Sequence, residues 1–326
     1  MSGDSLLLAD YLDYVLLAEK LGFTNIFMVE HHFTGGGQVS SSLGLLTYLA
    51  AKTSRIRLGT AVIVLPWHNP AILAETVATL DVLSNGRFDF GVGKGYRPQE
   101  FSGFCIPQEE ASGRFDEALA FLRSSWTETD RFSHQGKFWN FEQVQIEPRT
   151  VQKPHPPLWM GATSAESIAR AAAEGVNLLL DQVAPIAEIG KRVKLYARIR
   201  DEARGDYNAS QIAVTRGLFI VGSEHERLNV IDKYAKLLGS AGALKWLGGD
   251  NAEAQSQAYK VSDAPLIGTP EQIIERLADL ERCGVDTVLI SDMSGSKETL
   301  RTFAAEIMPA FDPRGPAKSA PVALKG

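Results

Sequence analysis

Apolar residues recur along this chain in two alternating patterns, short continuous runs and longer stretches with the spacing of a helix. Over residues 6–21, apolar side chains such as Tyr11 and Val15 fall on one face, which predicts an amphipathic helix. Gly22 follows directly and is typical of a helix C-terminus. The run at 25–29 is apolar after its first residue and predicts a buried strand.

The same alternation continues to the end of the chain. Continuous apolar strands separated by helices indicate a parallel sheet that is covered on both faces. Further strands are expected at residues 57–65, 88–93, 158–161, 176–180, 212–221 and 287–290. Further helices are expected at residues 42–52, 70–83, 109–128, 164–174, 186–204, 271–283 and 298–310.

This pattern gives one strand fewer than the eight of a (β/α)₈ barrel. The chain opens directly on a helix at residue 6, with no strand ahead of it. We therefore expect an α/β protein with a (β/α)₈ TIM barrel that lacks its first strand at the N-terminus, because the opening helix needs a strand edge to pack on. An open parallel sheet is the alternative.

One domain is expected over residues 1–311. Residues 241–266 are polar, contain glycine and show little periodicity, which predicts a mobile loop. Two other irregular stretches, 95–108 and 131–157, are expected to be loops with short extra strands. The proline-containing end, 312–326, is expected to be a disordered tail.

Composition and charge narrow the function classes. The chain is 44 % hydrophobic and 22 % charged, which is ordinary for a globular protein, and its net charge is −6. That charge argues against nucleic acid or an anionic membrane as a partner. Cys105 and Cys283 lie too far apart in sequence to suggest a disulfide framework or a metal-ligand spacing. Neither a signal peptide nor a membrane-spanning run is visible, so a cytoplasmic location is expected.

The densest group of polar residues is Glu30-His31-His32, at the end of the strand predicted for residues 25–29. In a (β/α)₈ barrel, catalytic groups lie at that end of the strands. Neighbouring histidines on an extended chain point in opposite directions, so only one can face the barrel axis. Such a histidine suits a general base or a hydrogen-bond donor, and two satisfied polar side chains are the alternative. No His or Cys set has the spacing of a zinc site, so no metal is expected.

A glycine-rich strand end forms the second candidate site. Gly91, Gly93 and Gly95 do not match the spacing of a dinucleotide-binding fingerprint, and Pro98 is expected to prevent the helix that such a site requires. We interpret these glycines as positions where a flat ligand approaches the backbone. Lys94 would then pair with a phosphate group, with a solvated loop lysine as the alternative.

Two further segments join a strand end to polar groups. Thr163 begins a four-residue pattern typical of a helix capping box, which alone would explain it. The same helix start, with Ser164 and Ser167, would also bind a phosphate-type anion together with Lys94. The apolar run at 59–65 would either lie beneath a planar cofactor or belong only to the core.

Taken together, these segments resemble the bacterial luciferase-like flavin-dependent monooxygenases. The similarity extends over about residues 6–310, and the ordered set is more specific than any one motif. The resemblance implies a (β/α)₈ barrel, which agrees with the strand pattern less one. The segments that carry it are Val29–Thr34, Gly59–Pro66, Gly86–Arg97, Ala162–Ser167 and Gly268–Glu271.

The resemblance also implies roles for individual residues. His31 corresponds to an active-site histidine that supports the flavin peroxide formed with oxygen. Ala61 and Val62 correspond to a non-prolyl cis peptide bond beneath the flavin ring. The phosphate of FMN would be bound by Lys94, Arg114, Thr163, Ser164 and Ser167.

The implied activity is a monooxygenase that uses reduced FMN and O₂ to oxygenate a small organic substrate of the aldehyde, ketone or hydrocarbon type. A separate flavin reductase would supply the reduced FMN, and a homodimer is expected. A deazaflavin-dependent oxidoreductase, a non-catalytic flavin-binding subunit and a metal hydrolase on the same barrel are the alternatives. The expected walls of the substrate pocket are Phe33, Trp67, Tyr96 and Phe104.

Overall fold

The main sheet of the protein contains nine strands, and every pair of neighbours in it is parallel. The computed structural model describes residues 3–33, 39–240, 258–259, 263–292 and 294–311. The strand order is β1-β2-β4-β7-β8-β9-β10, with β3 also paired to β4 and β11 to β9. These strands are β1 (Asn25–Met28), β2 (Arg57–Thr60), β3 (Ile63–Val64), β4 (Phe88–Gly93), β7 (Leu158–Gly161), β8 (Asn177–Leu180), β9 (Ile212–Ile220), β10 (Leu266–Gly268) and β11 (Thr287–Asp292).

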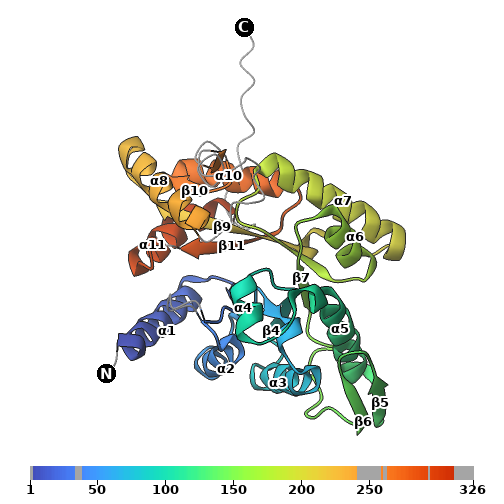
Figure 1. Ribbon diagram of the computed structural model, residues 1–326. Coiled ribbons are helices and arrows are strands. Elements are labelled where there is room, and N and C mark those ends of the chain that lie inside the picture. Colours follow the sequence, from blue (N-terminus) through green and yellow to red (C-terminus); the bar gives the residue numbers. More distant parts are fainter. Residues whose placement is uncertain (1–2, 34–38, 241–257, 260–262, 293, 312–326) are drawn as a thin grey trace.

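Helices surround the sheet, with the N-terminal half of the chain on one side of the molecule and the C-terminal half on the other (Figure 1). A separate antiparallel hairpin pairs β5 (Phe132–Gln135) with β6 (Asn140–Val144) beside α5. The α-helices are α1 (Gly3–Leu21), α2 (Ser42–Lys52), α3 (Pro70–Leu83), α4 (Pro98–Gly103), α5 (Ala111–Thr127), α6 (Ala165–Ala173), α7 (Ile186–Arg204), α8 (Glu224–Ser240), α10 (Pro270–Arg282) and α11 (Lys297–Thr302).

Side chains from distant strands meet inside the curled sheet. Along β9, Ala213 belongs to this interior cluster, whereas its neighbours Ile212 and Val214 belong to the larger core between sheet and helices. Alternate residues therefore face the interior and the helices, as the pleat of a strand requires. The predicted α/β barrel-type fold is confirmed. The interior cluster consists of Phe27, Ala61, Val62, Trp159, Leu179, Ala213 and Leu289.

Several local predictions were wrong or incomplete. The strand expected at 57–65 is interrupted after Thr60, and its second part is β3. Pro98 does not prevent a helix but begins α4, because a proline at the first helical position has no intrahelical partner to lose. Helix α8 and strand β10 were not predicted, and the helix expected at 298–310 is α-helical only as α11 and continues as a π-helix and a 3₁₀ helix.

Much of the loop predicted for 241–266 lies outside the described residues, as does the predicted tail at 312–326. At its end, Leu266 begins β10, and both Tyr259 and Ala264 are buried. The last part of this stretch is therefore packed against the barrel.

Strands β1 and β11 are the two edges at which the barrel would close. Within the described ranges, no backbone ladder joins them. Helix α1 connects to the β11 side through side chains: Tyr14 Oη donates to Asp292 Oδ2 at 2.6 Å, and Lys297 Nζ donates to Asp13 Oδ2 at 3.2 Å. This gap between β1 and β11 agrees with the sequence pattern, which predicted one strand fewer than the eight of a closed barrel.

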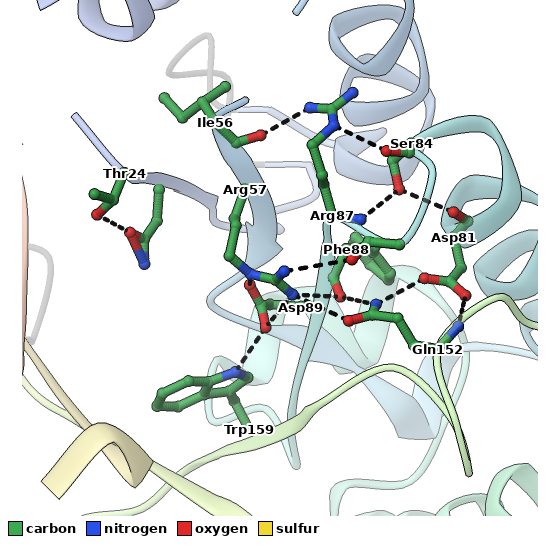
Figure 2. A network of polar contacts seen from close by, with 12 residues as sticks. Thr24, Ile56, Arg57, Asp81, Ser84, Arg87, Phe88, Asp89, Gln152 and Trp159 are labelled. Atoms are coloured by element: carbon green, nitrogen blue, oxygen red, sulfur yellow. Dashed lines mark hydrogen bonds and ion pairs between the residues drawn. The ribbon is translucent and has the colours of Figure 1, made fainter. Parts of the chain in front are cut away.

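A polar network ties the N-terminal ends of β2 and β4 together (Figure 2). Arg57 binds Asp89 through two hydrogen bonds of 2.7 and 3.0 Å, and Trp159 Nε1 donates to the same carboxylate at 3.4 Å. Gln152 connects this pair to Asp81, whose carboxylate also accepts two backbone N–H groups. The network lies at the face opposite the strand ends that carry His31, so its role is structural.

Asp89→Ala is expected to lower the free energy of unfolding by about 2–3 kcal/mol, because it removes a charge-assisted pair and leaves the indole N–H of Trp159 without its acceptor. Urea unfolding followed by circular dichroism measures this change. The exposed Asp130→Ala serves as the control, with an expected change within about 0.5 kcal/mol. Equal effects of the two substitutions would contradict the structural role.

Candidate active site

Glu30 lies at the C-terminal end of β1 and holds three segments together. Its carboxylate is buried and accepts hydrogen bonds from Val64 N at 2.8 Å, His68 Nε2 at 2.8 Å and His32 Nε2 at 3.1 Å. Burial alone would raise the pKa of Glu30, but the hydrogen bonds and charge of His68, with those from Val64 and His32, lower the pKa below its ordinary value. This role of Glu30 was not predicted from the sequence.

His31 points to a second buried carboxylate. Its Nδ1 lies 3.1 Å from Glu100 Oε1 in α4, and the same oxygen accepts His32 N at 2.9 Å. Because a carboxylate accepts the hydrogen on Nδ1, the neutral ring keeps its lone pair on Nε2. His31 N also donates to Val39 O at 3.1 Å, which fixes the backbone beneath the ring. The arrangement positions one ring nitrogen as a proton acceptor.

Glu100 was missed by the sequence analysis. The segment around it was expected to be a loop, and a single glutamate in a polar stretch carries no signal of burial. The apolar Phe101, which is also buried, is the one neighbouring sign that this turn packs inward.

The environment of His31 holds its pKa below the ordinary value. Burial is the main cause and the positive charge of Arg97 adds to it, whereas the hydrogen bond and charge of Glu100 and the charge of Glu30 act in the opposite direction. Its neutral form therefore persists to a pH below about 6.5, the usual pKa of histidine. Such a histidine can accept a proton near neutral pH.

Two substitutions should move the pKa of His31 in opposite directions. Glu100→Gln removes a group that raises it, so the pKa should fall further. Arg97→Ala removes a group that lowers it, so the pKa should rise. An NMR titration of the His31 ring measures both. Unchanged or like-signed shifts in the two variants would contradict these contacts.

Three of the four predicted pocket walls form one aromatic cluster with His32. Phe104 has its ring centroid 4.9 Å from both His32 and Phe33, and it stacks on Trp67 at 5.3 Å. Trp67 Nε1 is buried and has no hydrogen-bond partner among the described residues. Tyr96 does not join the cluster but is exposed beside Arg97.

The peptide bond between Ala61 and Val62 is cis, as the resemblance implies. Both side chains belong to the interior cluster. The neighbouring glycines lie against the protein's own chain. A Cβ on Gly91 would lie 1.7 Å from Thr60 O, and a Cβ on Gly93 would lie 2.5 Å from Val62 Cγ2. Gly91 therefore leaves room for the backbone of β2, and Gly93 leaves room for the side chain of Val62.

The candidate phosphate site at α6 is a helix start with two hydroxyl groups. Ser164, not Thr163, is the N-cap residue: its Oγ accepts Ser167 N at 3.2 Å and lies 2.9 Å from Ser167 Oγ. The predicted capping box at Thr163 was therefore off by one residue. Ser164 is exposed, and Thr163 and Ser167 are half-buried. Their hydroxyls and the first N–H groups of the helix are donors suited to an anion.

The two candidate cations lie at and near the start of α5. Lys94 Nζ donates to Ser112 Oγ at 3.4 Å, a long contact that holds it weakly. Arg114 donates to Glu110 Oε2 at 2.8 Å and stacks on the rings of Phe138 and Trp139, so it is held in place. An ion pair between Asp116 of α5 and Arg170 of α6 connects these two helices. No interaction between described residues joins Lys94 or Arg114 to Ser164.

Metal-binding groups and membrane-spanning helices are also absent from the described residues. They contain no group of three or more His, Cys, Asp or Glu residues arranged to bind a metal ion. No helix within them has the length and hydropathy needed to span a bilayer.

Comparisons with known proteins agree with this geometry. Residues 3–287 match the family model described as luciferase-like monooxygenase. An uncharacterised protein of Sinorhizobium fredii, y4vJ, is 38 % identical over 169 residues, which cover 52 % of this chain and 48 % of that protein. A protein of Acinetobacter baylyi named flavin-dependent trigonelline monooxygenase, oxygenase component, is 26 % identical over 321 residues, which cover 90 % of this chain and 87 % of that protein.

Among solved structures, the monooxygenase RslO1 of Streptomyces bottropensis is similar over most of its length. The TM-score is 0.82 at 27 % identity, and the match covers 95 % of each chain. The family match spans most of the sequence, and the fold agrees with it. This chain is therefore a member of the luciferase-like monooxygenase family.

Proposed function

We propose that this protein is an FMN-dependent monooxygenase that uses reduced FMN and O₂ to oxygenate a small organic substrate. A separate flavin reductase would supply the reduced FMN. Two observations carry this proposal: His31 is paired with the buried Glu100 at the C-terminal ends of the strands, and the interior of the sheet holds an apolar cluster that includes Ala61 and Val62. The similarity to a flavin-dependent oxygenase component supports it.

The residues present fit FMN. The interior cluster offers an apolar surface to the ring system. The hydroxyls of Ser164 and Ser167 and the start of α6 offer donors to the phosphate. Lys94 is weakly held and can turn toward an anion, whereas Arg114 would keep its contacts with Glu110 while adding positive charge.

Bound reduced FMN would supply the electrons that activate O₂. The protein's own part is positional. His31 Nε2 accepts or returns a proton at the reacting centre, and Glu100 holds its ring in one orientation. The aromatic cluster of His32, Phe33, Trp67 and Phe104 would offer the substrate an apolar surface around His32, next to His31 in sequence, with the ring of Phe33 largely exposed.

Oxygen uptake tests the proposal. The protein is mixed with photochemically reduced FMN and O₂, and aldehydes, ketones and hydrocarbons are screened for an oxygenated product. The expected result is a product that carries one oxygen atom derived from ¹⁸O₂. Turnover with a reduced deazaflavin in place of FMN, without incorporation of oxygen, would overturn the proposal in favour of hydride transfer.

Removing the candidate phosphate ligands should weaken FMN binding. Lys94→Ala is expected to cost about 1.5–3 kcal/mol of binding free energy, the scale of a charge-assisted hydrogen bond. Fluorescence titration with FMN measures the change. Lys20→Ala, an exposed lysine on α1, is the control. Equal affinities of the two variants would argue against a phosphate at this position.

The homodimer and the cytoplasmic location stay predictions of the sequence. Size-exclusion chromatography with light scattering tests the first.

A further inference from the structure

Helix α8 brings a tyrosine to the C-terminal end of the barrel. Tyr234 is 3 % exposed and packs its ring against Phe219 and Tyr259, each with a centroid distance of 5.9 Å. These residues belong to a second hydrophobic core, separate from the main one, that fixes α8 against the sheet. Its buried members are Val183, Val221, Ile231, Tyr234, Ala235, Tyr259, Ala264 and Ile267.

The hydroxyl of Tyr234 reaches the interior face of the sheet. Gly217 and Ser291 are paired across β9 and β11. They lie an even number of residues after Ala213 and Leu289, which belong to the interior cluster, so they share its face. A Cβ on Gly217 would lie 2.4 Å from Tyr234 Oη, so this glycine makes room for the hydroxyl.

This hydroxyl orients the side-chain amide of Gln182, which follows β8. Tyr234 Oη donates to Gln182 Oε1 at 3.1 Å and is also hydrogen-bonded to Ser291. The amide oxygen is therefore turned toward Tyr234 and the amide nitrogen away from it. Gln182 is half-buried, and its Nε2 makes no hydrogen bond to any residue that the structure describes. An amide with a fixed oxygen presents a donor in one direction.

Gln182 lies at the same end of the barrel as the candidate active site. The strands of the sheet are parallel, so Gln182 after β8 and His31 after β1 lie at the same end of the barrel. The cluster inside the sheet is apolar. A polar donor at the edge of an apolar pocket fixes the orientation of a ligand and selects for an acceptor atom.

We propose that Gln182 donates a hydrogen bond from Nε2 to an acceptor oxygen of the organic substrate, and that Tyr234 and Ser291 position it. This inference rests on the proposed function and narrows its substrate class. Ketones, aldehydes and other molecules with an acceptor oxygen should be bound in preference to hydrocarbons of the same shape, because an unpaired donor disfavours a ligand without an acceptor.

The test uses two probes of matched shape, 2-octanone and 2-methyl-1-octene, which differ in a C=O and a C=CH₂ group. Saturation-transfer NMR measures their dissociation constants with the full chain, with and without oxidised FMN. We expect the wild-type protein to bind the ketone about tenfold more tightly. Gln182→Glu replaces the donor by an acceptor at nearly constant volume and should abolish this preference.

Tyr234→Phe keeps the ring but removes the hydroxyl, so it should reduce the preference for the ketone without abolishing binding of the alkene. Tyr196→Phe is the matched control: its hydroxyl is also buried but donates to Val176 O. The control should keep the wild-type preference. A wild-type protein that does not prefer the ketone, or a Gln182→Glu variant that still does, overturns the inference. Because binding is measured without turnover, a failure of the proposed oxygenation shows separately, as absence of the ¹⁸O-labelled product.

Discussion

His31→Ala is expected to lower product formation by about 10²–10⁴-fold, the usual contribution of a positioned general acid or base. The physical reason is that Glu100 fixes the Nδ1 side of the ring at 3.1 Å and leaves Nε2 as the acceptor. Alanine removes that acceptor and leaves the buried carboxylate in place, still bound to His32 N. Turnover with reduced FMN and ¹⁸O₂ measures the loss.

The same variant should keep its affinity for FMN, because the candidate phosphate ligands lie on α6 and near the start of α5. His225→Ala is the matched control, since this histidine is exposed on α8. Full activity of the His31→Ala variant would show that His31 takes no part in the reaction. Loss of FMN binding together with activity would instead show that His31 shapes the flavin site.

The largest expected effect on stability comes from Gly91→Ala, which should lower the free energy of unfolding by more than about 4 kcal/mol. A Cβ at this position would lie 1.7 Å from Thr60 O and 3.2 Å from Leu179 Cδ1. The first of these atoms is backbone, so it cannot move aside without displacing β2. Gly91 and Thr60 also exchange two hydrogen bonds through the Thr60 hydroxyl, at 2.8 and 2.9 Å.

Soluble yield and thermal unfolding followed by circular dichroism measure this effect. Gly222→Ala is the matched control, because no atom lies within 4 Å of a Cβ built there and its φ is not positive. The control should unfold close to the wild-type temperature. A Gly91 variant as stable as this control would show that β2 and β4 can separate locally.

Long periodic segments made most of the fold predictable. The helix expected at 186–204 is α7 with the same bounds, and the strand expected at 88–93 is β4. Helix α8 was not predicted, although Ser223 and Glu226 have the spacing of a capping box and Ser223 Oγ accepts Glu226 N. The Glu226 carboxylate accepts Gly222 N, one residue earlier than in a capping box. The interruption between β2 and β3 falls inside a continuous apolar run, so the hydrophobic pattern does not indicate it.

The candidate site was predictable where residues form a motif and not where they act through tertiary contacts. His31 was found from its place at a strand end. Glu100 and Gln182 make their contacts with His31 and Tyr234 through tertiary packing of the segments around α4 and α8, and single polar residues in irregular stretches give no sign of this. The N-cap residue was predicted as Thr163 and is Ser164, because both are residue types favoured at a helix start and a boundary inferred from sequence is uncertain by one or two residues.

The break between β1 and β11 changes how the barrel is held together. In a closed barrel, backbone hydrogen bonds join every pair of neighbouring strands around the whole circumference. Across the gap between β1 and β11, the described hydrogen bonds from α1 are made by side chains, Tyr14 with Asp292 and Asp13 with Lys297. Within the described residues, these two edges are therefore joined by side-chain contacts and helix packing, not by backbone hydrogen bonds.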